Sequence, residues 1–124
     1  VRMLLKALKR GEAVGMLPDQ APRNGEGRWL DFFGRPAYTM TLAARLSETG
    51  AAVLMIWAER LPGGAGFHIR IQPPQQAIEG TLDERAQCIN KEIEHVILQC
   101  PDQYLWGYNR YKRRRGVEAP PEEN

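Results

Sequence analysis

The chain has 124 residues, of which 43% are hydrophobic and 26% are charged, and its formal net charge is +2. This length suits one domain and these fractions are close to globular averages, so a wholly disordered chain is excluded, and a charge near zero gives no global indication of nucleic-acid binding. The longest uninterrupted apolar run, residues 51–58, is far shorter than the about 20 residues that a membrane-spanning helix needs.

The first half of the sequence predicts a helix, a strand, a loop and a second helix. Residues 1–10 place apolar and basic side chains on separate faces at helical spacing. Residues 13–17 form a short apolar run that predicts a buried strand, and residues 18–28 have the Pro, Asn and Gly content of a loop. Residues 29–33 predict a brief strand or a lid-like segment, and residues 39–48 suit a short helix.

The second half predicts two strands and the longest helix. Residues 51–58 are continuously apolar, as in a central strand covered on both faces, and the strand–helix–strand order predicts a right-handed parallel crossover from residues 13–17. Residues 67–72 alternate apolar and polar side chains, which predicts a half-exposed strand antiparallel to its predecessor. Thr81 begins the longest helix, with a capping-box glutamate three residues later, and Pro101 ends it. We therefore expect an α/β fold with a mixed, partly parallel sheet flanked by helices.

The C-terminal region changes character twice. Residues 101–115 are aromatic and basic together, whereas residues 116–124 are rich in Pro and Glu and are expected to form a disordered tail. Cys88 and Cys100 lie in one predicted helix at a separation of about 18 Å, which is too long for a disulfide bond. Their spacing is not that of a zinc site, so two free, buried cysteines are expected.

Catalytic motifs are scarce. His68 and His95 have no carboxylate at catalytic or metal-ligand spacing, so both are expected to be surface residues. The sequence contains no nucleophile elbow, phosphate-binding glycine loop or zinc signature, and we expect no metal or other cofactor. Asp19 and Gln20 follow an apolar run, which is where α/β proteins place polar groups at the mouth of a site. The alternative is a solvated aspartate at an ordinary strand exit.

Several blocks, in order along the chain, resemble the bacterial lipid A biosynthesis acyltransferases, the late lauroyl and myristoyl transferases. The resemblance runs from Val1 to about Arg115. The blocks are residues 17–20 (LPDQ), 31–36 (DFFGRP), 42–46 (LAARL), 49–51 (TGA), 101–106 (PDQYLW) and 110–112 (RYK).

This resemblance implies a transferase of lipopolysaccharide biosynthesis on the cytoplasmic face of the inner membrane. Such an enzyme moves an acyl chain from acyl carrier protein to a hydroxyl of a lipid A precursor, and its fold is like that of the glycerolipid acyltransferases. The family's general base is a histidine followed five positions later by an acidic residue. That pair has no match here, because Pro73 follows His68 and Cys100 follows His95 at this spacing. Residues 1–115 are therefore expected to be the C-terminal half of an acyltransferase domain, a fragment that is inactive alone.

The resemblance also points to acceptor-binding residues. By order, residues 17–20 occupy the place of the acceptor-binding loop of related glycerolipid acyltransferases, although they depart from the Glu-Gly-Thr-Arg pattern of that superfamily. Nearby arginines suit phosphate, and a paired phenylalanine suits either the wall of an acyl groove or the core. The expected substrate-binding residues are Asp19, Gln20, Arg23, Arg28, Phe32, Phe33 and Arg35.

Cations mixed with aromatic residues predict contact with an anionic membrane surface. Two alternatives use the same residues. One is a non-catalytic peripheral membrane module. The other is a surface for single-stranded nucleic acid, although nucleic acid is not the expected partner. The expected membrane-contact residues are Arg2, Lys6, Lys9, Trp106, Arg110, Tyr111, Lys112, Arg113, Arg114 and Arg115.

Overall fold

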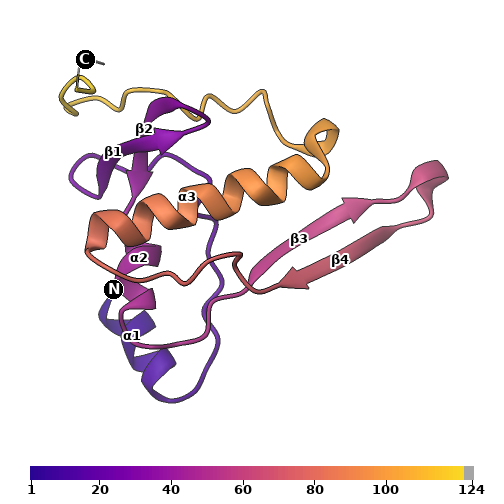
Figure 1. The fold of residues 1–124 in the computed structure, drawn as a ribbon, viewed down its shortest axis with the longest axis horizontal. Helices are drawn as coiled ribbons and strands as arrows, with labels where there is room; N and C mark the ends of the chain where they lie inside the picture. Colours follow the sequence, from indigo (N-terminus) through magenta and orange to yellow (C-terminus); the bar gives the residue numbers. More distant parts are fainter. Residues whose placement is uncertain (122–124) are drawn as a thin grey trace.

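The computed structural model of the chain describes residues 1–121, and residues 122–124 of the predicted tail lie outside the described residues. Within residues 116–121, Val117 is buried. The described elements, in chain order, are α1 (Arg2–Lys9), β1 (Gly27–Phe32), β2 (Arg35–Met40), α2 (Leu42–Ser47), β3 (Met55–Arg60), the 3-10 turn η1 (Pro62–Gly64), β4 (Phe67–Gln72), α3 (Leu82–Gln99) and the 3-10 turn η2 (Pro101–Gln103) (Figure 1).

The core lies where the antiparallel hairpin β1–β2 and the short helix α2 pack against α3 (Figure 1). The helix α3 carries apolar residues at steps of three and four, so one of its faces turns toward the hairpin. Phe32 fills the centre of this contact and is 1% exposed. The buried core residues are Phe32, Ala37, Ala44, Ala86, Ile89, Ile93 and Ile97.

The predicted start of α3 is confirmed. The Thr81 hydroxyl accepts a hydrogen bond from the Glu84 amide at 3.3 Å, and the Glu84 carboxylate accepts one from the Thr81 amide at 2.7 Å. This reciprocal capping box satisfies two amide groups that the helix leaves unpaired at its N-terminus. Pro101 follows the last helical turn and begins η2, as expected.

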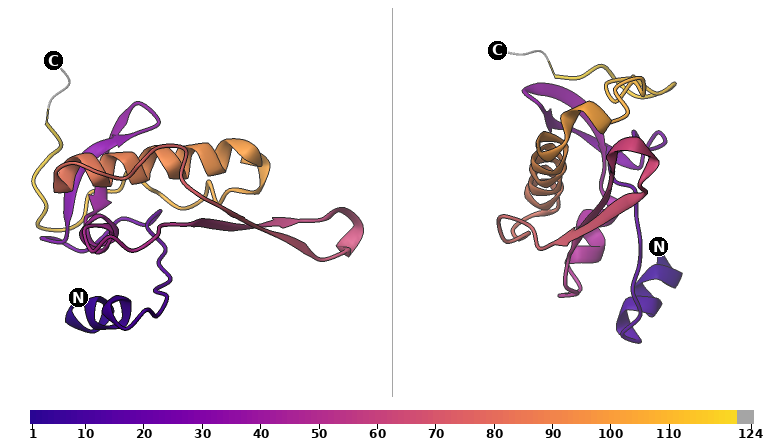
Figure 2. Two further views of the ribbon diagram at one scale, coloured as in Figure 1. Left: turned by 60° about the horizontal axis from the view of Figure 1, so that its bottom comes forward. Right: turned by 90° about the vertical axis from the view of Figure 1, so that its right-hand side faces the viewer.

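The hairpin β3–β4 projects away from the rest of the molecule (Figure 2). Its strands pair antiparallel from Met55 opposite Gln72 to Arg60 opposite Phe67, which confirms the predicted strand and its direction. The apolar face of this hairpin is more exposed than predicted, because the cross-strand neighbours Ile56 and Ile71 are 65% and 61% exposed. This apolar face therefore lies in solvent rather than against a core.

The predicted parallel crossover is wrong. Residues 13–17 adopt no regular structure, β3 begins at Met55 rather than at residue 51, and the described residues form two separate antiparallel pairs instead of a mixed sheet. A buried parallel strand needs neighbouring strands on its edges as well as helices on its faces. Among the described residues, neither hairpin pairs with residues 13–17 or 51–54. The coarse α/β class is correct, whereas the likeness to glycerolipid acyltransferases stays a prediction.

Candidate functional site

An apolar groove of about 360 Å³ lies between α1, the linker that follows it, the segment before β3 and the inner face of α3. Leu8 of α1, Met16 of the linker and Ile93 of α3 are among its lining residues. Leu17 and Leu54, which also line it, are 70% and 59% exposed, so the groove opens at the surface. Its volume lies within the range of small-molecule sites.

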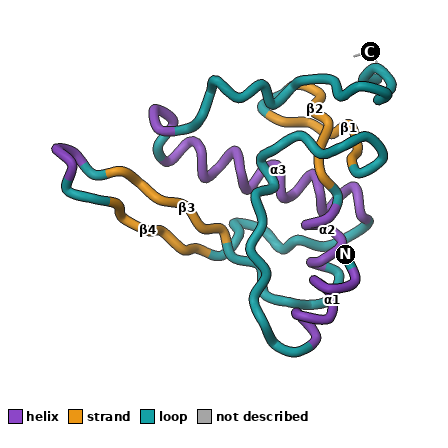
Figure 3. The backbone as a smooth tube through the Cα atoms, turned by 180° about the vertical axis from the view of Figure 1, so that it is seen from behind, coloured by secondary structure: helices purple, strands orange, loops and turns teal. Residues whose placement is uncertain are grey.

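The two apolar runs that predicted parallel strands both line this groove. Residues 14 and 16–18 contribute from the linker, and residues 51–57 contribute from the approach to β3 and from β3 itself. Figure 3 shows the linker as an extended loop between α1 and β1. The two runs therefore lie at one place, although they do not pair as the predicted strands. Side chains that a central sheet would bury instead form the wall of an open groove.

Asp19 is the one carboxylate among the described residues that line the groove. Ser47, Trp57 and Tyr104 are the other lining residues that carry polar groups, and the Ser47 hydroxyl already donates to the Ala44 carbonyl at 2.7 Å. The pKa of Tyr104 is raised, first by burial and then by the negative charge of Asp19, so the phenol is neutral at physiological pH. The groove thus combines an apolar wall with one charged group.

The other predicted polar residues do not line this groove. Gln20 and Arg23 are exposed on the loop that follows Asp19. Arg28 forms an exposed ion pair with Asp83 at 3.7 Å, and the guanidinium of Arg35 lies 4.3 Å from the ring centre of Tyr111.

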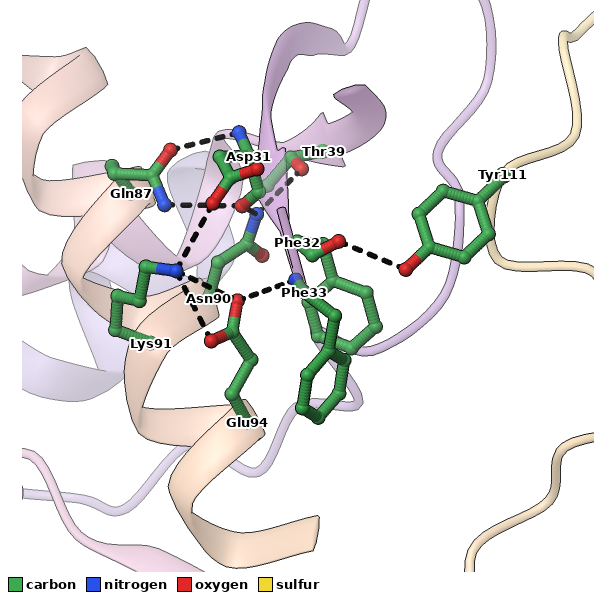
Figure 4. Close-up of polar contacts among 9 residues, drawn as sticks. All are labelled: Asp31, Phe32, Phe33, Thr39, Gln87, Asn90, Lys91, Glu94 and Tyr111. Atoms are coloured by element: carbon green, nitrogen blue, oxygen red, sulfur yellow. Dashed lines mark hydrogen bonds and ion pairs between the residues drawn. The ribbon is translucent and has the colours of Figure 1, made fainter. Parts of the chain in front are cut away.

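The prediction that Phe32 contacts substrate is wrong, because its ring lies in the core. Its centroid is 4.9 Å from that of Phe33 in an edge-to-face contact, and the Tyr111 hydroxyl donates to the Phe32 carbonyl at 2.8 Å (Figure 4). The Phe33 amide donates to the Glu94 carboxylate at 2.7 Å (Figure 4). Phe33 also lies outside the lining of the groove. The DFFGRP block therefore joins β1 to α3, and its phenylalanines belong to that junction.

A network of polar side chains from α3 completes this junction (Figure 4). Gln87 accepts from the Asp31 amide at 2.9 Å and donates to the Asp31 carbonyl at 3.0 Å. Asn90, which is fully buried, donates to the same carbonyl at 2.9 Å and to the Thr39 hydroxyl at 3.0 Å. Lys91 pairs with the Asp31 carboxylate at 3.0 Å. These polar groups are paired with one another by hydrogen bonds and an ion pair, so the network has a structural role.

Arg110 is a correction to the predicted membrane surface. It is 2% exposed, and its guanidinium donates to the Tyr38 carbonyl at 2.9 Å and to the Thr39 hydroxyl at 3.0 Å. It also lies 5.0 Å from the ring centre of Phe32. A side chain in this position cannot touch a lipid headgroup. Composition alone could not separate it from its exposed neighbours Arg113 and Arg115.

The groups that most often bind metals or catalyse reactions are dispersed. Among the described residues, no cluster of three or more His, Cys, Asp or Glu side chains could hold a metal ion, and no helix has the length and apolar character needed to cross a bilayer. His68 is exposed and His95 is half-buried. Cys88 and Cys100 are free and half-buried rather than fully buried, and burial raises the pKa of the Cys88 thiol.

The sequence is similar to that of a known protein family. A family model described as "Bacterial lipid A biosynthesis acyltransferase" matches residues 1–113. Over 118 residues the chain is 33% identical to the lipid A biosynthesis palmitoleoyltransferase of Escherichia coli, covering 92% of this chain and 38% of that protein. It is 32% identical over 118 residues to the lipid A biosynthesis lauroyltransferase of the same organism, covering 90% and 37%. The chain therefore spans less than two fifths of the length of these curated relatives.

Proposed function

The chain belongs to the bacterial lipid A biosynthesis acyltransferase family, and from this premise we propose that it is part of an enzyme that transfers a fatty acyl chain from acyl carrier protein to a lipid A precursor. The relatives' names support the lipid A step, since they are a palmitoleoyltransferase and a lauroyltransferase of lipid A biosynthesis. We place the protein at the cytoplasmic face of the inner membrane, where both substrates of such a reaction meet. The comparisons give no support to the two non-catalytic alternatives.

The observation that carries the proposal is the groove itself. Its aliphatic wall suits an acyl chain, because each methylene moved from water to an apolar site contributes about 0.8 kcal/mol. Five such methylenes supply about 4 kcal/mol, enough to discriminate between chains that differ by a few carbons. The carboxylate of Asp19 can accept hydrogen bonds from hydroxyl or amide groups of the glucosamine acceptor. In this proposal the groove binds the acyl chain and Asp19 meets the polar acceptor.

The general base comes from elsewhere in the polypeptide under this proposal. The 124 residues contain no histidine followed five positions later by an acidic residue, and the relatives are more than twice as long as the matched region. The proposed division of labour is that this region supplies substrate binding while another region supplies proton transfer. We therefore propose that the isolated chain does not turn over substrate.

Exposed cations support the proposed membrane contact. Arg2, Lys6 and Lys9 of α1 are exposed, as are Arg113 and Arg115 near the C-terminus. Each cation close to an anionic leaflet contributes about 1 kcal/mol at physiological ionic strength, so the three cations of α1, whose Leu8 lines the groove, can hold that side of the groove at the bilayer.

A groove-filling substitution tests the acyl-chain assignment in the full-length enzyme. Ala52 lines the groove and is exposed, whereas Ala58 is exposed on β3 and does not line it. Ala52→Trp should lower kcat/KM for the longest accepted acyl donor by about tenfold or more while sparing short donors, because the indole occupies space for several methylenes. Ala58→Trp is the matched control. An unchanged chain-length profile in Ala52→Trp would remove the groove from acyl binding.

A further inference from the structure

The C-terminal segment from Tyr108 to Arg114, here called the strap, contacts the loop that carries Asp19. It runs along the β1–β2 hairpin (Figure 1). The Ala21 amide donates to the Tyr108 hydroxyl at 2.9 Å. Arg114 donates to the Ala21 carbonyl at 2.8 Å and to the Pro22 carbonyl at 3.2 Å. Three strap hydrogen bonds therefore fix the backbone two and three residues after Asp19.

The loop has little else to hold its backbone. Within the described residues, no helix or strand lies between Lys9 and Gly27, and residues 13–22 take part in no backbone–backbone hydrogen bond. Ala21 is nevertheless 4% exposed, and a buried amide or carbonyl must find a partner elsewhere. The strap supplies those partners from side chains about ninety positions away in sequence. Further along the loop, the Tyr38 hydroxyl accepts from the amides of Gly25 and Gly27 at 3.1 and 3.2 Å.

The strap is itself anchored to the core. Between its two loop-binding residues, Arg110 is buried and bonded to Tyr38 and Thr39, and Tyr111 is bonded to the Phe32 carbonyl. Arg110 has no carboxylate partner within ion-pair distance among the described residues. Burial is the largest influence on the pKa of Arg110 and lowers it. A fixed strap can therefore set the position of the loop.

We infer that Tyr108 and Arg114 are positioning residues, which hold the Asp19–Gln20 loop at the edge of the groove by binding the backbone of Ala21 and Pro22. This inference rests on the proposed function, because it assigns the loop to acceptor binding. In this role the planar shape of the Arg114 guanidinium matters as well as its charge. A lysine ammonium cannot reproduce the guanidinium fork that reaches both carbonyls.

The test uses variants of the full-length enzyme that separate the loss of a contact from the loss of a charge. Tyr108→Phe removes the hydroxyl and keeps the ring. Arg114→Gln and Arg45→Gln each remove one cation, but the exposed Arg45 of α2 has no hydrogen bond to the loop among the described residues. Trypsin cleavage after the exposed Arg23 reports opening of the loop, and steady-state kinetics with a lipid A precursor report its function.

We expect Tyr108→Phe to speed cleavage after Arg23 by about fivefold, the effect of one lost hydrogen bond on a local opening equilibrium, and Arg114→Gln to speed it at least as much, because Arg114 makes two such bonds. Their KM for the acceptor should rise about threefold to tenfold with kcat within about twofold of the parent. Arg114→Lys should behave like Arg114→Gln, and Arg45→Gln should match the parent in both assays.

Three results would overturn the inference. These are unchanged cleavage in the strap variants, faster cleavage with an unchanged KM for the acceptor, and equal effects of Arg114→Gln and Arg45→Gln, which would indicate a role of net charge. Failure of the proposed function gives a different result. In that case the parent enzyme itself does not turn over the lipid A precursor.

Discussion

Replacing Asp19 by alanine in the full-length enzyme separates a ligand-binding carboxylate from a structural one. Asp19 lines the apolar groove and has no ion-pair partner among the described residues. Its loss therefore removes no ion pair from the folded protein, and the melting temperature should change by less than about 2 °C, as for most surface substitutions. A structural aspartate that braced its loop would instead cost about 1 kcal/mol or more.

The kinetic effect should be much larger. One or two hydrogen bonds that the carboxylate accepts from the sugar acceptor contribute about 1.4–2.8 kcal/mol, which corresponds to a loss of about tenfold to a hundredfold in kcat/KM. This loss should be the same for acyl donors of every length, because Asp19 meets the polar acceptor rather than the acyl chain. A dependence on donor length would show that the substitution disturbs the apolar wall.

The assay follows transfer from acylated acyl carrier protein to a lipid A precursor, with activity expressed per folded molecule. Asp83→Ala is the matched control, since it removes an exposed carboxylate whose 3.7 Å pair with Arg28 lies away from the groove. Normal kinetics in Asp19→Ala together with a large fall in melting temperature would refute the acceptor-binding role. Equal kinetic losses in Asp19→Ala and Asp83→Ala would refute it as well, because the effect would then follow net charge.

Four further outcomes are expected. The isolated chain should give no acyl transfer above a boiled control, and clear turnover would mean that it contains its own general base. Arg113→Gln with Arg115→Gln should weaken binding to anionic vesicles at low salt, provided that the buried Arg110 is kept so that the fold survives; unchanged sedimentation would contradict the membrane contact. Thr81→Ala should cost about 0.5–2 kcal/mol of unfolding free energy in a denaturant titration, and no loss would mean that the capping box does not stabilise α3. Cys88 should react with iodoacetamide at pH 8 more slowly than a free cysteine, since its raised pKa lowers the thiolate fraction, and an equal rate would contradict this.

Elements whose signals are local were predictable from the sequence. The capping box at Thr81 and the alternating pattern of β4 depend on residues within a few positions, so they identified α3 and the second hairpin correctly. The strand β2 was missed because Pro36 lies within it, and a proline ordinarily argues against a strand. In the structure β2 pairs only with β1, and such an edge strand tolerates a residue that has no amide hydrogen.

Features that depend on distant neighbours were not predictable. Residues 13–17 have the composition of a buried strand, but their conformation depends on whether a partner strand is present. The same limit applies to Arg110, since a run of cations does not reveal which one turns inward. Asp19 lines the groove, and a carboxylate after an apolar run is a local signal, whereas its role in acceptor binding stays a prediction. The tail residues that contact its loop carry no pattern that links them to it.

The strap also sets the order in which the chain can finish folding as it is synthesised. The two hairpins and α3 form from contacts that are close in sequence, whereas the bond from Arg114 to Ala21 spans 93 positions. At about 5–20 residues per second, the ribosome needs roughly 5–20 s between these two residues, and microsecond hairpin formation is long complete by then. The loop that carries Asp19 therefore stays open to proteases and chaperones until Arg114 has emerged, long after the hairpins have formed.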